Sequence, residues 1–176
     1  QIEDIKKSNK MIDITSEATR SITESSKFKV EGLSIENQIS VANYIRDYLN
    51  NPTHAGELIP MVASLTNNGI VAQITEYNDA ILRRQKLLEN SSERNPVIQD
   101  MDNVLAAVRR SIIASLNSHV STLEIQLSNM RKEEALANHR ISTMPSQEKV
   151  LLDIMRQQKI KEELFLYPVS YTHLTL

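Results

Sequence analysis

Residues Ile98 to Ile141 read IQDMDNVLAAVRRSIIASLNSHVSTLEIQLSNMRKEEALANHRI. Apolar residues recur here at steps that alternate between three and four, which places them on one narrow face of an α-helix. A helix of this length is too long for the core of a compact domain. We therefore predict an all-α fold of long antiparallel helical hairpins in a coiled-coil rod. The predicted helix-packing or oligomer seam is formed by Ile98, Met101, Leu105, Val108, Ile112, Leu116, Val120, Leu123, Leu127 and Met130.

Proline, glycine and asparagine divide the rest of the chain. Asn50-Asn51-Pro52 ends a first helix, because proline disfavours helical geometry in the residue before it. Asn95 is expected to cap the long helix and Pro96 to occupy its first position. The predicted segments are a long helix over 1–51, a connector over 52–69, a second helix over 70–90, the long coiled-coil helix over 96–142 and a last helix over 146–167.

The direction of these helices is open at the level of sequence. If every break between helices reverses the chain, the four successive helices alternate in direction, and the path of the chain runs out, back, out and back. At Asn95-Pro96 the alternative is a kink, and the six polar residues from Ser91 to Pro96 favour a reversal. Arg84 falls on the seam of the second helix, where its stem can pack while its guanidinium reaches water. Asp102 is assigned to the favourable N-terminal end of the long helix's dipole.

Composition excludes several kinds of protein. The net charge is −2 and basic residues do not gather on one face, so a nucleic-acid partner is not expected. The absence of cysteine rules out disulfides and thiolate metal sites. No apolar run is long enough to cross a bilayer. The chain opens at Gln1 in helical sequence, and we expect it to be a piece of a longer protein.

No residue pattern in the chain indicates catalysis, and we expect neither enzyme activity, nor a cofactor, nor a metal site. No glycine of the chain is followed by lysine, so the Gly-Lys-Ser/Thr sequence of a phosphate-binding loop does not occur. The histidines do not pair at the i, i+4 spacing of metal ligands, and the neighbours Ser118 and His119 have no predicted orienting partner. The charged stretches that contain Arg109, Arg131 and Lys159 read as solvated helix faces.

Two C-terminal stretches carry a resemblance to a known family. They are PSQEKVLL, from Pro145 to Leu152, and RQQKIKEELFLY, from Arg156 to Tyr167. Together with the upstream motifs they resemble the periplasmic region of chain-length determinant proteins, the polysaccharide co-polymerases joined to bacterial tyrosine autokinases. The upstream motifs are similar to the version found in gut Bacteroidota. The upstream motifs are Glu76-Tyr77-Asn78 to Leu87-Leu88, Asn90-Ser91-Ser92, Asn95-Pro96-Val97-Ile98 and Arg110-Ser111-Ile112-Ile113.

The resemblance implies a parent protein anchored in the inner membrane, with this chain as the helical projection of a periplasmic α/β domain whose base is missing. A cytoplasmic P-loop tyrosine kinase would belong to that parent. Its implied partners are further copies in a ring and the envelope machinery that polymerises and exports capsular or exopolysaccharide. Arg156 stands where the family has an arginine, and the resemblance implies an ion pair with the missing base or with a neighbouring subunit. The alternative is that Arg156 is a surface residue.

The sequence departs from the family after Tyr167. Residues 168–176 turn β-prone and resemble translated adapter or primer read-through, so we expect this tail to be non-native. Two other interpretations of the chain remain open. One is a periplasmic adaptor hairpin of an efflux or secretion system, and the other is a soluble coiled-coil adaptor.

Overall fold

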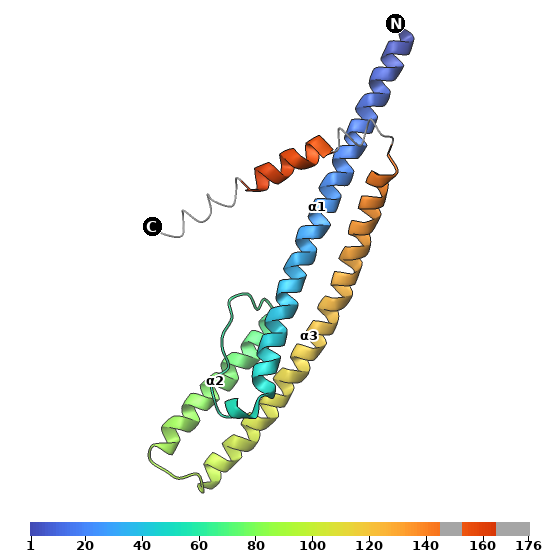
Figure 1. The fold of residues 1–176 in the computed structure, drawn as a ribbon. Coiled ribbons are helices and arrows are strands. Elements are labelled where there is room, and N and C mark those ends of the chain that lie inside the picture. The colour runs from blue at the N-terminus through green and yellow to red at the C-terminus, as the bar shows by residue number, and fades with distance from the viewer. Residues whose placement is uncertain (145–152, 165–176) are drawn as a thin grey trace, which may run out of the picture. The chain divides into compact units, whose positions relative to one another are not determined.

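The computed structural model describes residues 1–144 and 153–164 and is helical throughout its regular elements (Figure 1). No strand occurs in these two ranges, which confirms the predicted all-α fold. Residues 153–164 are also helical. The predicted helix over 146–167 is therefore described only in part, and the tail 168–176 lies outside the described residues. The labelled elements are α1 (Ile2–Asn50), the 3-10 helix η1 (Pro52–His54), α2 (Asn68–Leu88) and α3 (Pro96–Ser142).

The chain divides into two compact units, which we describe separately. The first contains Gln1–Gly32 and the described residues from Asn129 onward. The second is Leu33–Ser128.

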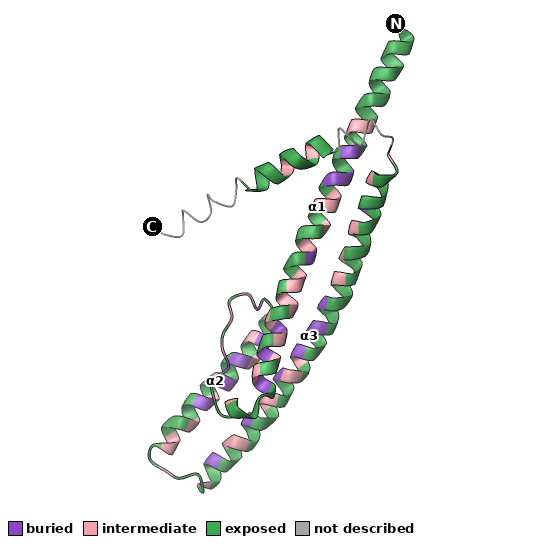
Figure 2. Ribbon diagram, in the orientation of Figure 1, coloured by how far each residue is buried: buried purple, intermediate pink, exposed green. Residues whose placement is uncertain are grey.

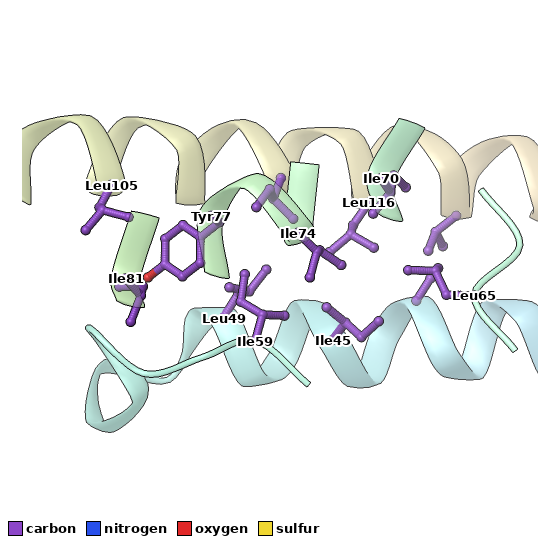
Figure 3. Packing of buried hydrophobic residues seen from close by; sticks show 13 residues of the cluster. Ile45, Leu49, Ile59, Leu65, Ile70, Ile74, Tyr77, Ile81, Leu105 and Leu116 are labelled. Carbon is purple, nitrogen blue, oxygen red and sulfur yellow. The ribbon is translucent and has the colours of Figure 1, made fainter. Parts of the chain in front are cut away.

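The second unit has a core built from three helices and the connector. Buried isoleucine and leucine side chains from α1, α2 and α3 meet between the helices (Figure 3). Among them Ile45, Ile74 and Leu116 have no exposed surface. Each such side chain contributes about 1.5–3 kcal/mol by leaving water. Tyr77 lies in the same cluster and is 2% exposed.

Helices α2 and α3 of this unit are antiparallel. Near the end of α2, Arg84 bonds to Asp102 in the second turn of α3. At the beginning of α2, Asn67 Nδ2 lies 3.4 Å from Nδ1 of His119, much further along α3. The chain therefore reverses between the two helices and does not kink. Asn95 caps α3, with its Oδ1 accepting a hydrogen bond from the Val97 amide at 2.9 Å.

The direction of α2 differs from the out, back, out and back path. Thr66, the residue before the α2 cap, bonds through Oγ1 to Gln38 Oε1 at 3.2 Å. The connector that leaves α1 at Asn50 has thus already run back beside that helix. Helix α2 then runs parallel to α1, and both are antiparallel to α3 (Figure 1). A path in which each helix reverses direction is therefore wrong. The extended connector, and not a helix, brings the chain back along α1.

Local chemistry explains where these elements start and stop. Asn67 caps α2 by accepting a hydrogen bond from the Ile70 amide at 3.1 Å, so the helix begins at Asn68 and not at the predicted residue 70. The only helical turn in the connector is η1, which Asn51 caps and Pro52 begins. Gly56 follows with φ of 81°, a left-handed conformation that a side chain disfavours.

The first unit contains a second, smaller packed region. Ala18 and Ile22 of α1 are buried there, with Ile141, Met144 and Met155 packed against them. Hydrogen-bonded and charged pairs flank the small cluster. Ser25 Oγ bonds to Asn138 Oδ1 at 2.8 Å, and Arg140 Nη1 bonds to Glu24 Oε2 at 3.0 Å.

Candidate functional site

The predicted seam of α3 faces the interior of the chain. None of its ten residues is exposed. Leu105, Ile112, Leu116 and Val120 belong to the core of the second unit, where α1 and α2 cover them. This face is therefore occupied by helices of the same chain. The buried members are Ile98, Leu105, Ile112, Leu116, Val120 and Leu123, and the partly buried ones are Met101, Val108, Leu127 and Met130.

Asn78 anchors the connector on α2. Its Oδ1 accepts a hydrogen bond from the Ile59 amide at 2.8 Å, and its Nδ2 donates to the Ile59 carbonyl at 2.9 Å. The side-chain amide thus satisfies both backbone groups of a residue that is 2% exposed. Ile59 in turn packs in the core beside Leu49 (Figure 3).

Arg109 holds the C-terminal end of α1. Its Nε donates to the Leu49 carbonyl at 2.9 Å, and its Nη1 donates to the His54 carbonyl at 3.0 Å. A third contact joins Nη2 to the Asn51 carbonyl at 3.3 Å. These carbonyls lie at a helix end, where intrahelical partners run out and a cation is favourable. The prediction that Arg109 belongs to a solvated face was wrong, because it flanks the inward seam beside Val108 and Ile112.

Three polar side chains form a cluster where α1 meets the connector. The ring of His54 stacks on Tyr48, with ring centroids 4.1 Å apart and planes 11° from parallel. His54 Nδ1 lies 2.7 Å from Glu57 Oε2, so this nitrogen carries a proton. The Tyr48 hydroxyl lies 3.0 Å from both Glu57 Oε2 and the Leu58 carbonyl, and can donate to either. Gly56 supplies the turn that brings Glu57 back to this position.

The cluster shifts two proton equilibria. The hydrogen bonds from His54 and Tyr48 lower the pKa of the Glu57 carboxyl below its usual value. Burial, and then the hydrogen bond to Glu57, raise the pKa of the Tyr48 hydroxyl. Glu57 is more than half exposed, so the cluster acts as a local clamp on the connector.

Arg84 joins α2 to α3 next to the loop that connects the two helices. Its guanidinium binds both carboxylate oxygens of Asp102, with Nη2 3.0 Å from Oδ2, and also reaches Glu93 Oε2 at 2.6 Å. The Arg84 side chain is 19% exposed, so its stem packs as predicted, and its guanidinium is held by the two carboxylates. Asp102 therefore forms a hairpin ion pair in addition to its expected position near the N-terminus of α3.

A hollow of about 540 Å³ lies beside His119 at the start of α2. Hydroxyl and small side chains from α3 line it, together with Asn67 and Ile70. The His119 ring contacts the Asn67 amide, which does not act as an acid–base partner. The lining residues are Asn67, Ile70, Ser111, Ala114, Ser115, Ser118, His119 and Thr122.

The remaining predictions concern ligands and the C-terminal segment. Arg156 is exposed on the helical segment 153–164. Over residues 1–144 and 153–164, no group of three or more His, Asp or Glu side chains is arranged to hold a metal ion. Within the same ranges, no helix is long and apolar enough to cross a membrane.

Comparison of the chain with protein-family models, with curated proteins and with solved structures finds no match in any of the three.

Proposed function

We propose that this chain is a structural spacer that assembles with further copies of itself, of the kind found in polysaccharide co-polymerases. The observation that carries this proposal is the use of the apolar residues. The longest apolar ladder of the chain lies on α3 and packs against other helices of the same chain. The polar clusters at Arg109, Asn78 and Arg84 likewise fasten helices and the connector to one another. A protein built in this way transmits position and spacing between its ends.

The motifs from Glu76 to Ile113 and from Pro145 to Tyr167 support the polysaccharide part of the proposal. They resemble the periplasmic region of chain-length determinant proteins, which assemble around the machinery of capsular or exopolysaccharide synthesis. In this proposal the chain is a periplasmic segment of an inner-membrane protein. Its partners are the polymerase and export proteins of the envelope, and Arg156 docks on a base or a neighbouring subunit.

Sequencing the genomic locus on both sides of the coding region tests this proposal. We expect a membrane span upstream of Gln1. Downstream of Tyr167 we expect leucine-rich sequence, a second span and a Gly-Lys-Ser/Thr loop. A complete gene that has no membrane span on either side would reject the co-polymerase assignment and favour a coiled-coil adaptor.

A second test follows in the source cell. Deletion of the gene should change the length distribution of a surface polysaccharide on a gel, and restoring the full gene should return it. An unchanged distribution would separate the chain from length control.

A further inference from the structure

Helix α1 has a second seam that faces away from the core. Apart from Met11, every large apolar side chain that α1 exposes falls on one heptad ladder, with between 57% and 73% of its surface in water. The other positions of this ladder hold small uncharged residues. None of the charged residues of α1 falls on the ladder. We call this ladder the outer seam. In the first unit it comprises Ile2, Ile5, Asn9, Ile12, Ser16, Thr19, Thr23, Ser26 and Val30.

The outer seam is distinct from the face that α1 buries. With 100° between successive residues, the buried Ala18 lies well around the helix from the outer seam, while the buried Ile22 borders it beside Ser26. In the second unit, the buried Ala42, Ile45 and Leu49 also fall away from the ladder, whose spacing continues there. The ladder positions of that unit are Leu33, Asn37, Ser40 and Tyr44.

The N-terminal end of α1 has no packing of its own. Residues 1–13 are all exposed, as the uninterrupted green of this part of α1 shows (Figure 2). An isolated helix this short is marginal in water, and most helical stability in proteins comes from packing an apolar face. Ile2, Ile5 and Ile12 supply such a face. An apolar partner along this stretch would therefore stabilise the N-terminal end of α1.

We propose that this partner is the outer seam of a second copy, packed parallel and in register. The repeat places Ile2, Asn9 and Val30 at a positions, and Ile5 and Ile12 at d positions. Parallel in-register pairing sets isoleucine against isoleucine and Asn9 against Asn9. Asparagine at an a position is a known determinant of register and oligomer state, and Asn37 lies at a further a position of the ladder.

Antiparallel pairing fits the same residues poorly. There, a positions of one helix face d positions of the other. An overlap of residues 2–26 would set Ile12 against Ser16 and Ile5 against Thr23, with Asn9 against Thr19. The apolar layers of that register would be lost to polar contacts. An overlap of residues 2–33 would keep Ile2 against Leu33 and Ile5 against Val30, but would still set Ile12 against Thr23. Parallel in-register pairing is the arrangement that matches every apolar ladder residue with an apolar one.

The inference rests on the assembly role proposed above and names the surface that carries it. Sedimentation velocity of the 176-residue chain over a wide concentration range is the first test. We expect association to a species of twice the 20.0 kDa chain mass. The double variant Ile5→Lys/Ile12→Lys should raise the dissociation constant by about a hundredfold or more, because it places charges in the apolar layers. Ile125→Lys, at a 65% exposed position of α3, is the matched control and should leave association unchanged.

A cross-linking experiment tests direction and register. The native chain has no cysteine, so Asn9→Cys introduces a single thiol. Parallel in-register pairing brings the two thiols within disulfide range, and a covalent dimer should form on oxidation. Asn117→Cys, at an exposed position of α3, should not cross-link. Association that persists without an Asn9→Cys cross-link would overturn the parallel arrangement.

One alternative occupant lies in the same chain. Met155 Sδ is 4.0 Å from Thr19 Oγ1, so the segment 153–164 approaches one edge of the outer seam. If that segment covers the seam, the wild-type chain will be monomeric while its amides over residues 2–17 exchange slowly with deuterium. A monomeric wild-type chain would overturn the inference, whether the amides over residues 2–17 exchange slowly or fast. It would leave the result of sequencing the locus untouched, so the two proposals can fail separately.

Discussion

Replacing Asn78 by alanine tests what holds the connector against α2. The amide of Asn78 makes two hydrogen bonds to the backbone of Ile59, and Asn78→Ala removes both. The amide and carbonyl of Ile59 then lack partners in a site where the residue is only 2% exposed. Since these groups are obligatory hydrogen-bond formers, the connector must either leave them unpaired or open to water.

The expected loss of stability follows from the two orphaned groups. An unpaired buried donor or acceptor costs about 1–3 kcal/mol, and the site is partly buried, so we expect a loss of about 2–4 kcal/mol. Asn78→Asp keeps the acceptor but removes the donor, and should fall between alanine and the wild type. The assays are urea unfolding followed by circular dichroism and hydrogen exchange of the Ile59 amide, which should lose protection.

The control is Asn117→Ala, which changes the same residue type at an exposed position of α3. It should alter the free energy of unfolding by less than about 0.5 kcal/mol. A comparably small loss for Asn78→Ala, with the Ile59 amide still protected, would refute the reasoning. The connector would then be held by its apolar contacts alone.

Further predictions concern the core, the hairpin ion pair and the Glu57 cluster. Ile45→Ala should lower the free energy of unfolding by about 2–5 kcal/mol in urea, because the side chain has no exposed surface and leaves a cavity; a loss under about 1 kcal/mol would argue against the core as described. A double-mutant cycle of Arg84→Met and Asp102→Asn should give a coupling of about 1 kcal/mol, and a coupling of zero would show that the pair adds nothing. The pKa of Glu57 is lower in the folded chain than its usual 4.5, so its contribution is present above pH 4.5 and lost as the pH falls through the folded value. The stability difference between wild type and Glu57→Gln should therefore shrink on acidification below pH 4.5, and a difference that grew would contradict this sign.

The inward face of α3 could be predicted because helical periodicity is local. Every 3.6 residues complete one turn, so the steps between Ile98 and Met130 are enough to place these side chains on one face. The start of α3 follows equally local chemistry at Asn95 and Pro96. The sequence alone thus determined that long helices form and which side of α3 is apolar.

Periodicity did not reveal which contacts the polar residues make. Arg109 and Arg110 are adjacent arginines in the sequence, yet Arg109 binds the carbonyls at the end of α1 and Arg110 is exposed. Nothing near Asn78 in the sequence points to Ile59 as its partner. Such contacts join residues that lie far apart in the chain, and no local pattern encodes them.

The direction of α2 was decided by tertiary structure. Its sequence is equally compatible with running parallel or antiparallel to α1, since an amphipathic helix can bury the same face either way. The contacts of the connector, Thr66 to Gln38 and Ile59 to Asn78, settle that direction. They return the chain beside α1 before α2 begins. The repeat of a helix specifies which residues are buried, while the path between helices depends on where an irregular segment can satisfy its backbone groups.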